Sequence, residues 1–447
     1  MDTPIWDFAR AYRDAGGVRM HMPGHKGRPA EGPEGLDLTE ITGADELYQA
    51  RGIIRRSEEN AAALFGTAAT FYSAEGSSLC IRGMLALLRE WALRQGRPLR
   101  VLAGRNAHKT LMTACALLDL EIEWLYPEPE EGLLSCAVTA EKLDRALAEK
   151  PCAAVFVTTP DYLGHLTDLR PLSEICRRRG ALLLADNAHG AYLRFLPEDL
   201  HPMTRGADLC CDSAHKTFPC LTGAAYLHVS RRAPVFFRER AEAALSLFAS
   251  TSPSWLILQS LDRMNARLAG DWPARLAGAV RRTAEEKAWL REQGWETLGD
   301  EPMKLTLAPK ARGYTGRELH ALLREKGIEA EFADPDFLTL MPSPETEEKD
   351  WRRLRAALEG IPVRPALAEK PPAPAVPERA CGLREALLGP QAEIPVSLAE
   401  GRILADAAAG CPPAVPIAVS GERLSREAIA CFRYYGIDRV RVLLQLK

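Results

Sequence analysis

The feature that most constrains the fold is an alternation of short apolar runs with stretches of helical periodicity, from about Asp45 to Leu245. The predicted strands are Leu99–Ala103, Ile122–Tyr126, Ala153–Thr158, Ala181–Ala185, Asp208–Cys211 and Ala224–Val229. The predicted helices among them are about Ser78–Arg94, Lys109–Leu118, Ala140–Glu149 and Leu169–Arg179. Strands that alternate with helices of about 10–15 residues predict an α/β fold with a mostly parallel sheet. Such sheets bind ligands at the carboxyl ends of their strands.

The rest of the sequence predicts shorter segments and a small domain before and after this α/β domain. The predicted divisions are an N-terminal segment 1–44, a large α/β domain 45–290, a small α+β domain 291–361, a Pro/Ala-rich linker 362–378 and a C-terminal segment 379–447. Helices are predicted at Ser254–Ala269 and Pro273–Gln293, and further helix starts near Ser397 and Ser425. The run Pro302–Leu358 predicts the order strand, helix, strand, strand, helix. The linker composition favours an extended chain.

Charge and composition exclude several classes of function. The 57 basic and 60 acidic residues give a net charge of -3, which does not favour a nucleic-acid or acidic-membrane partner. No apolar run reaches the ~18 residues that suggest a membrane span, and the N-terminus lacks a signal-peptide pattern. The 11 cysteines form no CxxC pair and no zinc spacing, which is typical of reduced cytoplasmic thiols. We therefore expect a cytoplasmic protein without a metal site.

Common nucleotide and hydrolase motifs are absent, but polar residues gather at the predicted strand ends. Asp186 ends one apolar strand, and Lys216 follows the next. His108 lies in a loop after an earlier strand, and Gly76-Ser77-Ser78 opens a helix whose free N–H groups suit a phosphate. Each residue alone also has a plainer interpretation, since Asp and Ser often cap helices and a lysine at a strand end is usually solvated.

Together these residues are the parts of a site for pyridoxal phosphate (PLP). A lysine amine forms a Schiff base with the cofactor, an acid keeps its pyridine nitrogen protonated, and a helix N-terminus holds its phosphate. Three His-Lys pairs could supply the lysine, at Lys26, Lys109 and Lys216. Only Lys216 lies one strand after Asp186, 30 residues on, so that both can reach the same sheet edge.

Nine short motifs occur in order along the chain. They are His21–Gly27, Gly43–Leu47, Phe65-Gly66 with Thr70-Phe71, Gly76–Ser78, Arg105–Lys109, Pro160–Gly164, Asp186–Gly190, Ser213–Thr217 and Thr251–Ser254. Cys411–Pro416 with Gly421-Glu422 adds a C-terminal match. On these residues the sequence resembles the Orn/Lys/Arg decarboxylases of the PLP-dependent aspartate-aminotransferase fold (fold type I). It is most similar to the short bacterial members that lack a wing domain.

The resemblance implies a role for each matching residue. Lys216 would be the Schiff-base lysine and Asp186 the pyridinium partner, while His108 and Ala188 would cover the two faces of the cofactor ring. His189 would orient the cofactor hydroxyl or the departing carboxylate. The implied phosphate ligands are Gly76, Ser77, Ser78, Ser213 and His215, with Thr251 or Ser252 reaching the partner subunit's phosphate. A homodimer with shared active sites follows from that last role.

The implied reaction converts arginine, lysine or ornithine to the corresponding amine and CO2, a step of polyamine metabolism. Two alternatives remain open. An aminotransferase or another PLP-dependent lyase could share the fold; an aminotransferase would need an arginine for the substrate α-carboxylate, for which Arg312 and Arg317 are the candidates. A PLP-binding protein without turnover is the second alternative, although the intact set of Lys216, Asp186 and His108 argues against it.

Three positions depart from many relatives and leave the substrate open: Glu75, Asn187 and Gly223. An acid at Glu75 would repel a nearby phosphate, so we expect its side chain to point away or toward a cationic substrate.

Overall fold

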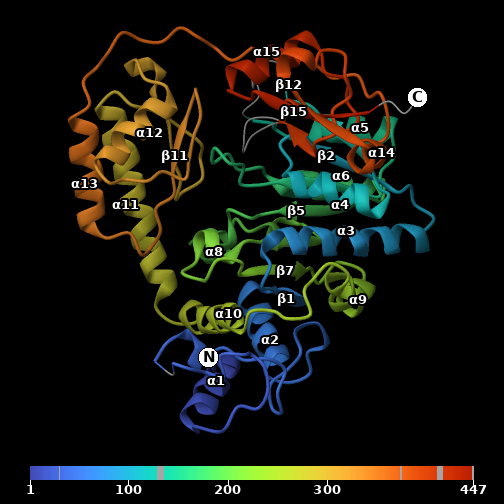
Figure 1. Ribbon diagram of the computed structural model, residues 1–447, viewed down its shortest axis with the longest axis vertical. Coiled ribbons are helices and arrows are strands. Elements are labelled where there is room, and N and C mark those ends of the chain that lie inside the picture. The colour runs from blue at the N-terminus through green and yellow to red at the C-terminus, as the bar shows by residue number, and fades with distance from the viewer. Residues whose placement is uncertain (30, 128–134, 373–374, 410–415, 445–447) are drawn as a thin grey trace. The chain divides into compact units, whose positions relative to one another are not determined.

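The computed structural model describes the chain except for residues 30, 128–134, 373–374, 410–415 and 445–447. The chain divides into two compact units, which are described separately. The first contains residues 1–98, 153–155 and 168–274, and the second contains residues 99–152, 156–167 and 275–447. Figure 1 labels the helices and strands of both. Most of the C-terminal match 411–416 lies outside the described residues.

The first unit contains four neighbouring strands. In order across the sheet they are β1 (Ala69–Ser73), β7 (Ala225–Val229), β6 (Leu209–Asp212) and β5 (Leu182–Asp186). β5 and β6 are parallel, whereas β7 is antiparallel to both β6 and β1. Every residue of these strands is buried, which explains why their sequences are continuous apolar runs rather than alternating ones.

Helices cover these strands. The helices of the first unit are α1 (Pro4–Asp14), α2 (Ile53–Phe65), α3 (Gly76–Arg94), α6 (Leu169–Arg179), α7 (Pro202–Arg205), α8 (Ala214–Thr217), α9 (Val235–Ser246) and α10 (Trp255–Leu268). The long helix α3 packs against β7, β6, β1 and α9 (Figure 1). Its N-terminus therefore lies next to the strands that carry the predicted site.

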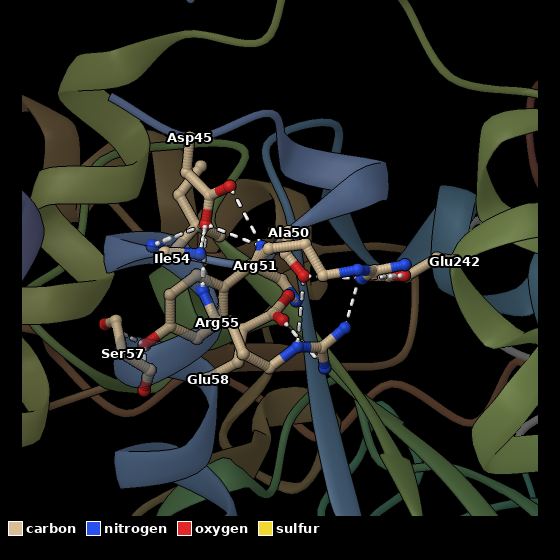
Figure 2. A network of polar contacts seen from close by, with 10 residues as sticks. Asp45, Ala50, Arg51, Ile54, Arg55, Ser57, Glu58 and Glu242 are labelled. Carbon is tan, nitrogen blue, oxygen red and sulfur yellow. Dashed lines mark hydrogen bonds and ion pairs between the residues drawn. The ribbon is translucent and has the colours of Figure 1, made fainter. Parts of the chain in front are cut away.

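Asp45, from the motif Gly43–Leu47, has a structural role. Its carboxylate accepts the backbone N–H groups of Arg51, Gly52, Ile54 and Arg55, and so caps the start of α2 (Figure 2). These donors hold the pKa of Asp45 below its ordinary value although burial opposes this. The first N–H groups of a helix have no partner inside the helix, so a carboxylate there stabilises it.

Glu58 of α2 is buried beside this cap, at 2% exposure. Its Oε1 accepts the N–H of Tyr72, and Arg55 lies between Glu58 and Glu242 (Figure 2). Burial raises the pKa of Glu58 from 4.5 to about 8; Glu242 and Asp45 act in the same direction, while the Tyr72 N–H and Arg55 oppose it. The folded protein thus keeps a proton on Glu58 that the unfolded chain loses above its lower pKa.

We therefore predict that Glu58 lowers the free energy of unfolding as the pH rises from about 4.5 to about 8. Glu58→Gln keeps an oxygen for the Tyr72 N–H but has no proton to lose. Its urea unfolding, measured across that range, should show a shallower decline with pH than the wild type. Identical slopes for the two proteins would contradict this assignment.

The second unit contains a parallel strand pair, a small antiparallel sheet and two short strand pairs. The parallel pair is β2 (Arg100–Gly104) with β3 (Glu121–Leu125), and its helices are α4 (Lys109–Leu118) and α5 (Ala140–Glu149). The small sheet has the order β10 (Phe332–Ala333), β11 (Leu338–Leu340), β9 (Leu305–Ala308) and β8 (Glu296–Leu298), with helices α11 (Trp272–Glu292), α12 (Gly316–Glu325) and α13 (Glu348–Glu359). Strand β4 (Ala154–Thr158) and helix α11 contribute residues to both units.

The C-terminal part of the second unit has its own core. It contains α14 (Leu383–Leu388), β12 (Gln391–Pro395), β13 (Ala408–Ala409), β14 (Ala418–Val419), α15 (Arg426–Tyr434) and β15 (Arg439–Leu443). Arg105 reaches this part through a buried, two-pronged ion pair with Glu422, at 2.7 Å for both N–O contacts. Its guanidinium also lies over the rings of Trp124 and Tyr126. Two of the sequence motifs, 317 residues apart, therefore meet as a packing contact.

The predicted elements are mostly confirmed. Helices α4, α5 and α6 have the predicted bounds, and the predicted strands are shifted by about one residue. The elements that were not predicted are helices α2, α7, α8, α9 and α14 and strands β1, β8, β12, β13, β14 and β15. The predicted helix start near Ser397 is wrong, because Val396–Leu398 forms only a 3₁₀ turn between β12 and the bridging residues Ile403 and Leu404. The start near Ser425 is confirmed, since Ser425 caps α15. Among the described residues, no helix is long and apolar enough to cross a membrane.

Candidate active site

Asp186 is the last residue of β5 and is 2% exposed. Its Oδ1 accepts the N–H of Ala188 at 3.2 Å and the thiol of Cys211 at 3.6 Å. The apolar strand before it and the tight turn after it, in which the Gly190 N–H donates to the Asn187 carbonyl, hold the carboxylate in one place. A buried, oriented carboxylate of this kind can stabilise a positive charge placed against it.

Lys216 lies in the short helix α8 that follows β6. Its Nζ is 3.1 Å from Nε2 of His189, which belongs to the turn after β5. Of the competing lysines, Lys26 donates instead to the backbone carbonyl of His21, and Lys109 is exposed at the start of α4 in the other unit. The structure therefore brings Lys216 and His189 together near the carboxyl ends of β5 and β6, a contact that the sequence did not predict.

The third part of the site is the N-terminus of α3. Ser213 Oγ, just after β6, donates to Ser77 Oγ at 2.7 Å. Gly76 begins the helix with φ +73°, and a β-carbon there would meet no atom within 4 Å. A positive helix end and serine hydroxyls together suit a phosphate, although the N–H of Gly76, a predicted phosphate ligand, is donated to the Gly223 carbonyl.

Gly223, one of the three departures, has a structural explanation. Its carbonyl accepts the N–H of Gly76 at 2.7 Å, and its φ is +99°. A β-carbon at this position would lie 2.8 Å from the Ala74 carbonyl oxygen. The close approach of this loop to the start of α3 therefore excludes a larger side chain at residue 223.

Glu75 turns toward the loop that carries Thr251 and Ser252. Its Oε1 accepts the backbone N–H of Ser250 at 2.7 Å. Thr251 and Ser252 are themselves exposed. The acid therefore anchors a loop whose hydroxyls remain accessible.

Two predicted residues have contacts that differ from their expected roles. His108 is the exposed N-cap of α4 in the second unit, with Nδ1 2.9 Å from Thr110 Oγ1. His215 Nδ1 lies 3.0 Å from the Ala224 carbonyl. Ring stacking by His108 and phosphate binding by His215 stay predictions, as does the packing of Ala188, which is 9% exposed.

The sequence did not point to a buried cluster around Asp212, the last residue of β6. Asp212 Oδ1 accepts the Asn187 amide at 2.7 Å, and Oδ2 accepts Nε2–H of His201 at 2.9 Å and of His228 at 3.0 Å. Burial disfavours ionisation of Asp212, but His201 and His228 hold its pKa well below its ordinary value. The signal for this residue was its position, because Asp212, like Asp186, ends an apolar strand.

The residues present fit PLP by the chemistry of their donor groups. An amine beside an imidazole, a buried carboxylate and a hydroxyl-lined helix N-terminus come from one unit and from neighbouring strand ends. These are the groups needed by a cofactor with an aldehyde, a ring nitrogen and a phosphate.

Comparison with known proteins gives consistent results. A sequence model described as Orn/Lys/Arg decarboxylase, major domain, matches residues 34–298. The arginine decarboxylase of Bacillus subtilis is 30% identical over 96% of this chain and 92% of its own length. That of Halalkalibacterium halodurans is 29% identical over 96% and 93%. The solved constitutive lysine decarboxylase of E. coli superposes with a TM-score of 0.76 at 19% identity, covering 99% of this chain and 82% of its own. The predicted fold class is thereby confirmed.

Proposed function

The chain belongs to the Orn/Lys/Arg decarboxylase family, and we propose that it decarboxylates arginine at a pyridoxal phosphate site built around Lys216. As a member of this family it is a PLP-dependent decarboxylase of a basic amino acid. The observation that carries the site assignment is the 3.1 Å approach of Lys216 Nζ to His189 Nε2, beside the buried Asp186. Arginine is proposed because four relatives of 28–30% identity, each with nearly full coverage of both chains, are named arginine decarboxylases.

When bound, PLP supplies an electron sink for the charge left on Cα as CO2 departs. Lys216 would attach the cofactor through its amine, and His189 would exchange a proton with Nζ so that this amine can reach its neutral, nucleophilic form. Asp186 would keep the proton on the pyridine nitrogen, because its buried carboxylate favours a positive charge beside it.

The remaining residues would hold and cover the cofactor. The hydroxyls of Ser77, Ser78 and Ser213 and the N–H groups at the start of α3 would bind the phosphate. Ala188 and His108 would lie against the two faces of the ring. None of these groups has to move a proton, so their contribution is to position the reacting atoms.

The aminotransferase alternative has little support from the candidate arginines. In the second unit, Arg312 stacks on Trp295 and donates to the Gln293 carbonyl, and Arg317 donates to the Tyr435 carbonyl at 2.7 Å. Both guanidinium groups thus have structural partners. The alternative of a PLP-binding protein without turnover is also disfavoured, because the Lys216 amine contacts the His189 imidazole and a buried carboxylate, Asp186, lies three residues before His189.

We further propose a cytoplasmic homodimer that shares its active sites and supplies amines for polyamine metabolism. Support for the dimer comes from the exposed Thr251 and Ser252, whose loop Glu75 anchors. None of the ten cysteines among the described residues forms a disulfide, as expected of a protein in a reducing compartment. Light scattering should give the mass of two chains, and a monomeric active enzyme would exclude the shared site.

The function is tested by incubating the purified holoenzyme with arginine, lysine and ornithine in parallel. We expect CO2 and agmatine from arginine, with kcat/KM at least about tenfold above the other two, since a change of chain length or head group commonly costs that much in discrimination. A higher kcat/KM for lysine or ornithine would exclude the arginine assignment. Absence of CO2 from all three would exclude the activity.

A further inference from the structure

We propose that Asp212, with His201 and His228, is a positioning residue for the cofactor site: it holds the Asn187 side chain, and so fixes the end of β5, which carries Asp186, against the end of β6, which leads to Lys216. This inference rests on the proposed PLP site. It assigns a role to three buried, fully enclosed polar side chains that touch neither the amine nor the phosphate-binding hydroxyls.

The position of Asp212 in the sheet supports this role. Its neighbours in the chain are Cys211, whose thiol contacts Asp186, and Ser213, which contacts Ser77. Across the strand pair, the Asn187 side chain donates to Asp212 Oδ1 at 2.7 Å, and the Asn187 N–H donates to the Cys211 carbonyl at 2.9 Å. Asp212 therefore joins the ends of β5 and β6 where the site is built.

The hydrogen-bond network continues from Asp212 to strands β7 and β1. His228 lies on β7, and its Nδ1 is 2.8 Å from Thr70 Oγ1 on β1, which is in turn 2.9 Å from Thr67 Oγ1. A single hydrogen-bonded path therefore crosses the four strands of the first unit and ends at Asn187. The polar side-chain atoms of Asp212, His201 and His228 all have hydrogen-bond partners, and a buried network of this kind restricts the relative positions of the elements that it joins.

The buried carboxylate of Asp212 requires hydrogen-bond donors at defined positions. Asp212, His201 and His228 are all 0% exposed, and a buried carboxylate is costly unless its oxygens are hydrogen-bonded. Three side-chain N–H groups satisfy this need, and burial lowers the pKa of His228, so that this imidazole stays neutral. The Asp212 carboxylate thus orients all three donors.

A metal ion is the alternative occupant, because His201, Asp212 and Cys210 lie close enough together to bind one. The hydrogen bonds of His201 oppose this interpretation. Its Nδ1 accepts the backbone N–H of Met203 at 3.3 Å, so the ring proton is on Nε2, the atom that faces Asp212. A protonated Nε2 has no lone pair for a metal, whereas it is the donor that the carboxylate requires.

Asp212→Asn tests the proposal, and Asp208→Asn is the matched control. Asp208 lies next to the opposite end of β6, where its Oδ2 accepts the Leu183 N–H of β5 at 2.8 Å, so both variants replace an aspartate that joins the same two strands. Apoprotein of each is titrated with PLP, and kcat and KM for arginine are measured on the saturated enzyme. Asp212→Asn should bind PLP on the order of tenfold more weakly, with a lower kcat and an unchanged KM, because the network contacts no substrate.

Asp208→Asn should bind PLP like the wild type, whatever its melting temperature. Equal losses of PLP affinity in the two variants would overturn the proposal, as would an Asp212→Asn protein that binds PLP normally. If the wild-type protein does not bind PLP at Lys216, that result would instead exclude the proposed function. A stoichiometric metal ion in the purified wild-type protein would show that these residues form a metal site, and would overturn the proposal that Asp212 acts through hydrogen bonds.

Two further variants keep the test decisive if Asp212→Asn does not fold. Asn187→Ala leaves the hydrogen bonds between the Asp212 carboxylate and the two histidines in place. It removes only the side-chain hydrogen bond between Asp212 and the residue that follows β5. It should show the same loss of PLP affinity, and normal affinity would overturn the proposal. Exchanging the two residues, Asn187→Asp with Asp212→Asn, restores one amide–carboxylate hydrogen bond and should recover part of the lost PLP affinity. No recovery would show that this hydrogen bond does not determine PLP affinity, and would overturn the proposal.

Discussion

Lys216→Ala is expected to abolish arginine decarboxylation, with kcat falling on the order of 10⁴-fold or more, as when other enzymes lose a catalytic nucleophile. The variant lacks the amine that we propose as the attachment point of the cofactor, which lies 3.1 Å from His189 Nε2. Because Lys216 is only half-buried and α8 is short, the fold should survive the change. The measurement is CO2 release from arginine by the variant saturated with PLP.

Lys26→Ala and Lys109→Ala are the matched controls, since each removes the lysine of a competing His-Lys pair. Both should keep their bound cofactor. Loss of the cofactor in either control, or near-normal turnover by Lys216→Ala, would show that the cofactor is attached at a residue other than Lys216.

Asp186→Asn is expected to keep the fold and some cofactor while kcat falls on the order of 10²–10³-fold, the effect of losing one preorganised electrostatic contact. The asparagine oxygen can still accept the N–H of Ala188, but an amide cannot balance the charge of a protonated ring nitrogen. Steady-state kinetics on the PLP-saturated variant measures the effect. Asp208→Asn again serves as the control, and an Asp186→Asn enzyme with half of wild-type kcat would exclude the role given to Asp186.

The sequence predicted those elements best whose ends carry a local signal. Helices α5 and α6 begin after Thr139 and Asp168, whose side chains cap them, and α6 ends at Gly180 in the left-handed conformation. Strand β1 and helix α9 carry weaker signals, because β1 includes the polar residues Thr70 and Ser73 and α9 has apolar residues on several faces. Their positions depend on packing against α3, which a local pattern does not report.

The site was predictable where its residues follow strands in sequence. Asp186 ends an apolar run, Lys216 lies shortly after the next one, and Ser77 opens a helix, so the parallel pairing of β5 and β6 leads to the expectation that they meet at one sheet edge. The cluster around Asp212 was not predictable, because His201 and His228 are isolated histidines that meet only through the antiparallel pairing of β7 with β6 and the cap of α7. The contact of Glu75 with Ser250 likewise joins residues 175 positions apart.

The central claim is that Lys216 carries the cofactor, and one measurement tests it most directly. Holoenzyme is reduced with borohydride, digested, and its peptides are mapped by mass spectrometry for the attached pyridoxyl group. The structure predicts a single labelled residue, Lys216, at one label per chain. A label on Lys26 or Lys109, or no label on a protein that releases CO2 from arginine, would contradict the account.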